Sequence, residues 1–335
     1  MFACGEKEEP SDEPTADNTK VVNVYSHRSY DVDSELYAAF EEETGIKVNV
    51  ISDKADMLIE KLKMDAQSSD ADLLITVDAA RLYRAVEEGL LDSVATETLL
   101  EQVPENLIGG NRQWYALTKR ARVLAYNPAN VKAEELETWE SITEDRFKGR
   151  ISVRSSDNVY NQSLLAAMIA SKGEEWATEW AKAVKKNMWS EPKGNDLDQM
   201  KNVAAGDADV AIVNTYYYGL LASSEDEAER EVADKIKLAF PVIPGGGVHV
   251  NVSGVGLLKN SPNRENAIKL MEYLTGGNAQ KIYSEDNYEY PANPNAVMSK
   301  MIASWPPFEE DATSLDSLGS YNKAAVKIFD VVGWK

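Results

Sequence analysis

Cysteine and histidine are scarce in this chain of 335 residues, which has one cysteine, Cys4, and two histidines, His27 and His249. A single cysteine cannot form a disulfide within the chain. Protein zinc sites are usually built from Cys and His, so the composition also argues against a zinc centre. Long apolar runs are missing as well, because none approaches the ~20 residues that a membrane-spanning helix requires.

Positive charge is also in short supply. Lys and Arg number 35 against 56 Asp and Glu, which gives a formal net charge of -21. A nucleic-acid-binding surface needs an excess of basic charge, so nucleic acid is excluded as a partner. The acidic balance favours a soluble surface and remains compatible with a cationic ligand.

The sequence motifs of common enzymes are missing too. There is no G-x-S-x-G, H-E-x-x-H or P-loop motif, no G-x-G-x-x-G after a strand, and no evident cysteine–histidine pair. The glycine run Gly245-Gly246-Gly247 is interpreted as a flexible turn. The chain is therefore predicted to be a binding protein and not an enzyme.

The N-terminus has a composition of its own. Ala3-Cys4-Gly5 is followed by a charged, Pro- and Asp-rich stretch, and residues 1–19 are predicted to form a disordered tether. A small residue before cysteine, then glycine and a polar tail, resembles the end of a bacterial lipoprotein signal. Cys4 would then carry a lipid that tethers the protein to a membrane. The expected location is periplasmic or otherwise outside the cytoplasm. The alternative is an ordinary exposed cysteine.

What the chain does have is an alternation of short apolar runs and amphipathic segments. Its length suggests two domains, and 43% hydrophobic residues suffice for a proper core. The first part alternates strand and helix three times, which predicts an α/β fold with a mainly parallel sheet and right-handed crossovers. The expected strands are 20–26, 46–52 and 71–77, and the expected helices are 35–44, 55–66 and 79–88.

After residue 91 this alternation breaks. Two expected strands, 114–118 and 120–127, follow one another with no helix between them. Tandem strands of this kind indicate a passage from one domain to the other. Residues 240–243 and the strand 249–258 are interpreted as the passage back.

Tyrosines stand where expected strands end and helices begin. The buried run 210–213 leads directly into Tyr216, Tyr217 and Tyr218. Tyr30 follows the first strand, and Tyr160 follows the strand 151–154. Ligands of open α/β sheets bind at the carboxyl ends of strands. These phenols are therefore candidate ligand-binding groups, although tyrosines can equally pack two layers together.

A cluster of phenols suits a hard, highly charged cation. Phenolate is a hard oxygen donor, and its ordinary pKa of about 10 means that only a strong cation displaces the proton near neutral pH. Ferric ion fits this demand best, because calcium and magnesium prefer carboxylates and carbonyls. Arg120 or Arg122 could offset the phenolate charge or hold a small anion, or either could form a salt bridge at the passage between domains.

Several motifs together resemble the periplasmic ferric-ion-binding proteins of bacterial ABC importers. They occur in order at family-like separations, and the resemblance covers about residues 20–335. It is closest to the branch with a tyrosine in the first loop. The motifs are Val24-Tyr25-Ser26-His27-Arg28-Ser29-Tyr30, Glu35-Leu36-Tyr37, Arg120-Ala121-Arg122-Val123, Tyr160-Asn161 and Asn214-Thr215-Tyr216-Tyr217.

The resemblance implies a two-lobed, type II periplasmic-binding-protein fold. Each lobe would be a mainly parallel sheet flanked by helices, and two strands would form the hinge. The N-terminal lobe is expected to comprise 20–118 and 243–293, and the C-terminal lobe 119–242 and 294–335. Such a protein, expected to be a monomer, would capture ferric iron between its lobes and deliver it to an ABC transporter permease.

The resemblance also implies a ligand set. Iron would be held by Tyr30, Tyr160, Tyr216 and Tyr217, with Arg120 nearby. The residues behind these ligands, or those that bind a small anion, would include Ser29, Tyr218 and Arg122. An alternative keeps the fold but replaces iron with a small organic cation, such as a polyamine or thiamine, held against the aromatic rings by cation–π attraction.

One position departs from the family pattern. Many relatives have histidine directly before the first-loop tyrosine, whereas this chain has Ser29. His27 could approach the site on a bent loop and act as an additional ligand, or it could be an exposed loop residue. His249 is expected at the hinge. Without a histidine, the protein would supply oxygen ligands only, and water or a small anion would complete the shell.

Overall fold

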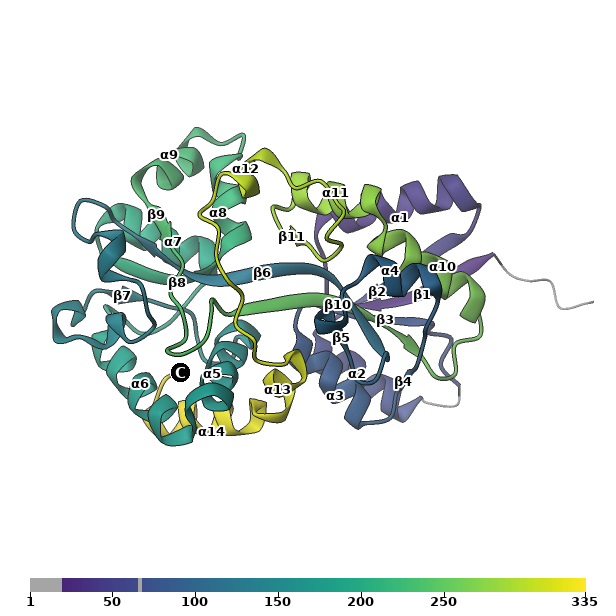
Figure 1. Cartoon of the computed structure of the whole chain (residues 1–335), viewed down its shortest axis with the longest axis horizontal. Helices are drawn as coiled ribbons and strands as arrows, with labels where there is room; N and C mark the ends of the chain where they lie inside the picture. The colour runs from purple at the N-terminus through teal and green to yellow at the C-terminus, as the bar shows by residue number, and fades with distance from the viewer. Residues whose placement is uncertain (1–19, 66–67) are drawn as a thin grey trace, which may run out of the picture.

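The computed structural model describes residues 20–65 and 68–335, and it is an α/β protein with one long mixed sheet. The sheet has 11 strands and runs through both ends of the elongated molecule (Figure 1). Its main order is β2-β1-β3-β10-β6-β8-β7. These strands are β1 (Val21–Ser26), β2 (Lys47–Ser52), β3 (Leu73–Thr76), β6 (Trp114–Tyr126), β7 (Ile151–Ser152), β8 (Val210–Asn214) and β10 (Val250–Leu258).

The first lobe confirms the strand–helix alternation predicted for the start of the chain. Strands β1, β2 and β3 are parallel, and β10 joins β3 in the antiparallel sense. Leu73, Leu74 and Ile75 are completely buried, as expected for a strand covered by helices on both faces. The helices of this lobe are α1 (Asp31–Thr44), α2 (Ala55–Met64), α3 (Ala79–Glu87), α4 (Glu97–Gln102), α10 (Arg264–Thr275) and α11 (Gly277–Asp286).

The second lobe is built around β8. This strand pairs with β7 in parallel and with the second half of β6 in the antiparallel sense. A separate buried cluster that includes Val203 and Val213 packs on one side of it. The other elements here are α5 (Val159–Lys172), α6 (Glu174–Asn187), α7 (Asp196–Ala205), α8 (Thr215–Ala222), α9 (Glu227–Lys235), β9 (Lys237–Ala239) and α14 (Asn322–Val332).

Strand β6 joins the two lobes. Its 13 residues were expected as two tandem strands, and the structure instead has one unbroken strand. Residues 114–121 pair with β10 and residues 122–126 pair with β8, so a single strand crosses the boundary. The backbone of β6 stays extended along its whole length, because each half forms inter-strand hydrogen bonds with a different partner strand.

The chain crosses the boundary again near its C-terminus. After β11 (Tyr290–Pro291) and α12 (Lys300–Ala303) it runs to α13 (Leu315–Ser320), which packs against both α3 and α5 (Figure 1). The short strands β4 (Leu91–Asp92) and β5 (Ile108–Gly109) complete the sheet. The expected lobe boundaries at residues 118, 242 and 293 stay a prediction.

The expected tether, residues 1–19 with Cys4, lies outside the described residues. Within the ranges 20–65 and 68–335, no helix combines the length and apolar character needed to cross a bilayer.

Candidate metal centre

Three tyrosine hydroxyls from three distant parts of the chain meet between the lobes. The hydroxyl of Tyr216 lies 3.1 Å from that of Tyr30 and 3.4 Å from that of Tyr160. Tyr30 belongs to the first lobe, whereas Tyr160 and Tyr216 belong to the second. The lobes are therefore closed on each other at this point.

Each tyrosine is placed by the start of a helix. Tyr30 is the residue before α1, and its backbone N–H donates to the Asp33 carboxylate at 3.3 Å. The sequence pattern had suggested that this helix starts at Glu35. The structure starts it at Asp31, because Asp33 satisfies the backbone of the loop. Tyr160 and Tyr216 each stand second in their helices, α5 and α8.

Tyr217 and Tyr218 follow Tyr216 in the first turn of α8. The ring of Tyr217 stacks on that of Tyr216, with centroids 4.1 Å apart and planes inclined by 30°. Tyr217 is thus a neighbour of the three-hydroxyl cluster. Tyr218, like Tyr217, also packs against the buried apolar cluster that includes Val203 and Val213.

The environment holds these phenols in the neutral form. Burial raises the pKa of Tyr30 and Tyr216 well above the usual value, and the nearby Tyr160 raises both further. Burial likewise raises the pKa of Tyr217, again with Tyr160 as the second cause. Charging any one of these groups therefore requires a compensating positive charge. Hydroxyls with this property suit a cation that displaces protons as it binds.

Arg120 lies behind Tyr160. Its guanidinium carbon is 5.0 Å from the centroid of the Tyr160 ring, and the side chain is 2% exposed. One terminal nitrogen donates to the Ser253 hydroxyl and the other to the Val252 carbonyl, both at 3.2 Å. The nearest carboxylate, that of Glu289, is 3.9 Å away. Arg120 is thus a buried positive charge beside the phenols that is only loosely paired.

Arg122 is paired much more tightly. It donates to the Asp196 carboxylate and to the Asn161 side-chain carbonyl at 2.7 Å each, and to that of Asn214 at 3.2 Å. Asn161 follows Tyr160, and Asn214 precedes α8, so Arg122 ties together the two helix starts that carry Tyr160 and Tyr216. Arg154 donates to the same Asp196 at 3.2 Å.

A second buried charge network lies beneath Tyr30, and sequence reasoning missed it. Arg28 stacks on the Tyr30 ring at 4.7 Å and donates to the carboxylates of Asp33 and Glu289, each at 3.0 Å. Thr118 donates to Glu289 at 2.7 Å. The only sequence signal for this network was the place of Arg28 inside the first-loop motif.

The histidines and Ser29 take other positions. Ser29 is exposed. His27 donates its backbone N–H to the Ile75 carbonyl at 2.8 Å, and burial lowers its pKa. Its Nδ1 atom is buried and finds no hydrogen-bond partner among residues 20–65 and 68–335. His249 lies directly before β10, with Arg120, Arg122 and Tyr160 lining the same small gap, in keeping with its expected place at the hinge.

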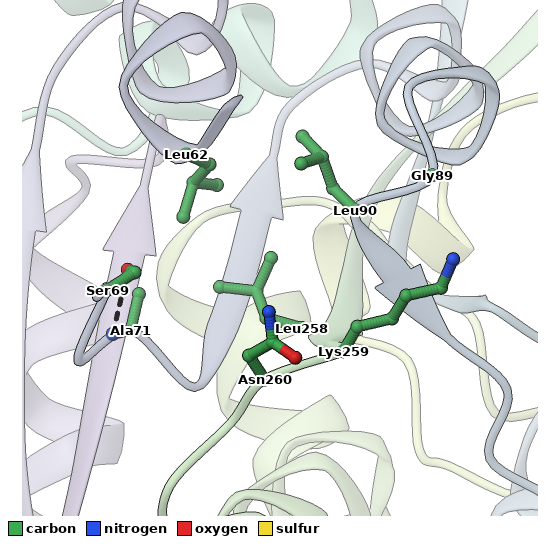
Figure 2. Close-up of a pocket in the computed structure, with 8 residues that line it drawn as sticks. All are labelled: Leu62, Ser69, Ala71, Gly89, Leu90, Leu258, Lys259 and Asn260. Carbon is green, nitrogen blue, oxygen red and sulfur yellow. Dashed lines mark hydrogen bonds between the residues drawn. The ribbon is translucent and has the colours of Figure 1, made fainter. Parts of the chain in front are cut away.

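Other metal-binding arrangements are not found in the described part of the chain. Within it, no group of three or more His, Cys, Asp or Glu side chains could hold a metal ion. A pocket of about 70 Å³ exists in the first lobe, lined by residues that include Leu62, Leu90 and Lys259 (Figure 2). None of the clustered tyrosines lines it, so it is separate from the candidate centre.

Comparisons with known proteins agree with this architecture. Residues 35–310 match the family model of bacterial extracellular solute-binding proteins. Iron uptake protein A1 of Synechocystis sp. is 45% identical over 335 residues, 100% of this chain and 93% of that protein. A Trichodesmium protein solved in complex with iron and citrate ligands has a TM-score of 0.88 and 43% identity, covering 94% of this chain and 100% of that one.

A further solved relative is similar over nearly the whole chain. It is the ferric iron-binding protein A of Mannheimia haemolytica in an open conformation, with a TM-score of 0.84 and 36% identity over 94% of this chain and 98% of that one. The two lobes, the hinge strands and the matches over nearly the whole chain lead to one conclusion: this chain belongs to the bacterial extracellular solute-binding proteins.

Proposed function

We propose that this protein binds ferric iron between its lobes through Tyr30, Tyr160, Tyr216 and Tyr217, and delivers it to an ABC importer. The observation that carries the proposal is the meeting of three buried phenol oxygens from three distant segments. The relatives named for iron uptake and for an iron complex support the choice of metal.

The spacing of the oxygens suits a small, hard cation. In an octahedral shell with metal–oxygen bonds of about 2.1 Å, neighbouring oxygens lie about 3 Å apart. The hydroxyl separations of 3.1 and 3.4 Å are close to that value. A cation inserted among these oxygens would therefore need only small side-chain shifts. Tyr217 would add a fourth oxygen, and water or a small anion would complete the shell.

Buried arginines would balance the charge of the loaded site. Several phenolates around one trivalent ion leave net negative charge, and Arg120 lies directly behind Tyr160. Arg28 stacks on Tyr30 from the other lobe. Arg122 is occupied by Asp196, so its proposed role is to hold Tyr160 and Tyr216 in place. His27 is a further candidate ligand, which a His27→Ala variant tests directly.

An organic cation between the rings has less support, because other groups already cover the ring faces. Tyr216 and Tyr217 stack on each other, Arg28 lies over Tyr30, and Arg120 lies over Tyr160. Cation–π binding of a polyamine or thiamine would require these faces to be free.

The proposal also covers where the protein acts and how it delivers its cargo. The protein acts outside the cytoplasm as a monomeric carrier without catalytic activity. The lobes close on iron, and the closed form is presented to a membrane permease. Residues 1–19 tether it through a lipidated Cys4, which mass spectrometry of the protein purified from its native membrane would detect.

Metal analysis and a visible spectrum test the iron proposal. The wild-type protein should carry about one iron per chain and show a phenolate-to-iron charge-transfer band. The double variant Tyr216→Phe, Tyr217→Phe should lose most of both, whereas Tyr321→Phe, at an exposed tyrosine, should keep them. A double variant with wild-type colour and iron content would disprove the ligand assignment.

A further inference from the structure

One contact between the lobes lies outside the tyrosine cluster. Gly219 of α8, one turn after Tyr216, lies against the ring of Tyr288. A Cβ atom built on Gly219 would come within 2.5 Å of Tyr288 Cβ and 2.8 Å of its Cδ2. No side chain fits there while Tyr288 stays in place. Glycine at this position therefore makes a notch in α8 that Tyr288 fills.

The two partners come from different lobes. Gly219 stands in a helix of the second lobe. Tyr288 lies between α11 and β11, and those elements pack on α1 and β6 in the first lobe. Figure 1 shows α8 and the α11–β11 segment facing each other on the same side of β6. The contact can exist only when the lobes are closed.

Tyr288 is held in place from both sides along the chain. Its φ of 53° is a left-handed backbone conformation that bulky residues rarely adopt. The preceding Asn287 donates its side-chain amide to Glu289 at 2.8 Å, and Glu289 holds Arg28 at 3.0 Å. The ring of the following Tyr290 packs 5.7 Å from Trp305. Strain of this kind persists where the surroundings over-determine it, and it points to a function of the residue.

We propose that Tyr288 is a closure residue, which seats in the Gly219 notch and so sets how long the closed protein retains its cargo. This inference rests on the proposed iron function, because retention is measured on the iron-loaded form. Tyr288 touches α8 one turn beyond Tyr216, so it acts on the iron site through the position of the lobe. It is a positioning residue and not a ligand.

Two opposite substitutions test the notch. Tyr288→Ala removes the ring and should speed iron release to a chelator about tenfold, equivalent to about 1.4 kcal/mol. Gly219→Ala fills the notch and should weaken iron retention at least as much. Both variants should keep the charge-transfer band position, since the ligands are unchanged. Tyr288→Phe keeps the ring and should behave as wild type.

The double variant decides whether the two residues act on each other. The background for this test is Tyr288→Gly, because alanine would keep the Tyr288 Cβ that lies 2.5 Å from the added methyl group. With the whole Tyr288 side chain gone, the methyl group of Gly219→Ala has room, so its effect should shrink to about twofold or less. Alanine in place of glycine favours a helix by about 1 kcal/mol, so α8 itself should not unfold. A penalty for Gly219→Ala that persists undiminished in the Tyr288→Gly background would overturn the proposal, as would wild-type release from both Gly219→Ala and Tyr288→Ala.

Small-angle scattering separates this inference from the iron proposal. Iron-loaded wild type should be compact, and iron-loaded Gly219→Ala should have a larger radius of gyration. A wild-type protein that takes up no iron refutes the proposed function. The closure proposal would then be judged on the iron-free proteins, where equal radii for wild type and Gly219→Ala would refute it.

Discussion

The side chain of Arg28 is completely buried, and its guanidinium lies between the carboxylates of Asp33 and Glu289. Removing it by Arg28→Met would take away the ion-pair partner of the buried Asp33 and leave Glu289 with Arg120, 3.9 Å away. A broken buried ion pair of this kind costs about 3–5 kcal/mol. We therefore expect urea unfolding to show a loss of that size. Because Arg28 also supports the Tyr30 ring, iron binding should weaken as well.

The exposed pair Arg146–Glu135 provides the matched control for Arg28. Surface ion pairs contribute about 0–1 kcal/mol, so Arg146→Met should be nearly neutral. The double variant Arg28→Met, Glu289→Met should recover part of the loss, because it removes a partner of the missing charge. Equal stability of Arg28→Met and wild type would contradict the role of this network.

His249 should make the fold sensitive to acid. Burial lowers its pKa to about 3, with Asp311 opposing the shift and Arg122 and Arg120 adding to it. The unfolded chain binds a proton here below about pH 6.5, whereas the folded chain stays neutral until much lower pH. Its contribution is thus present above the unfolded pKa and is lost as the pH falls, by about 2 kcal/mol between pH 7.5 and 5.

Urea unfolding at these two pH values, with wild type and His249→Gln compared, isolates the contribution of this histidine. The wild type should lose about 2 kcal/mol more than the variant on going to pH 5. An identical loss in both proteins would show that His249 is not the group responsible.

The two kinds of site residue differ in how far the sequence predicts them. The tyrosines could be found because each stands where an apolar strand pattern ends. Arg28 could not, because its partner Glu289 is 261 positions away and nothing local marks either residue as buried. A charged residue buried in a network over such a distance is visible only once the chain is folded.

At the scale of single elements, the sequence predicted where strands and helices occur better than it predicted their first and last residues. The alternation that opens the chain indicated β1, β2 and β3 correctly, since period and apolar content are local properties. The unbroken strand β6 was missed. Lys119 and Arg120 interrupt its apolar pattern, and their suitability for a strand depends on Glu310 and on the buried groups around Arg120, which come from elsewhere in the fold.

Two side-chain hydrogen bonds join α5 to α3 and its N-cap across the boundary between the lobes, and the longer one, at 3.3 Å, runs from Arg81 to Gln162. The Ser163 hydroxyl donates to the buried Asp78 carboxylate at 2.7 Å. Asp78 stands directly before α3, and Ser163 lies one turn after Tyr160 in α5. This bond stabilises the closed form only, because water replaces it when the lobes part.

Ser163→Ala should therefore shift the protein towards the open form. A lost hydrogen bond to a charged group costs about 1.5–3 kcal/mol, so iron affinity should fall about 10- to 150-fold. The charge-transfer band should not move, because no ligand changes. Ser171→Ala, at an exposed serine of the same helix, should leave the affinity unchanged. Affinity within twofold of wild type in Ser163→Ala would count against the bond as a closure element.

At the scale of the whole molecule, the tyrosine cluster depends on how the two lobes are placed about the hinge strands. The strand–helix pattern and the motif order were enough to predict the two-lobed α/β fold. They could not predict which contacts hold the lobes together, since Tyr288 with Gly219 and Ser163 with Asp78 join segments that are far apart in sequence. Closure brings the phenols together in a buried space, and burial is what keeps them protonated.

Iron uptake should therefore release protons. Because the pKa values of Tyr30, Tyr216 and Tyr217 are raised, these phenols are protonated near neutral pH, and each one that binds iron gives up a proton. The affinity should rise with pH, by about one decade per pH unit for each proton released. A pH indicator in weak buffer, with iron supplied as a defined chelate, should count up to about four protons per iron. The variant Tyr217→Phe should release one proton fewer per iron. If the protein took up iron and no protons appeared beyond those from the chelate itself, the phenols would not be the ligands.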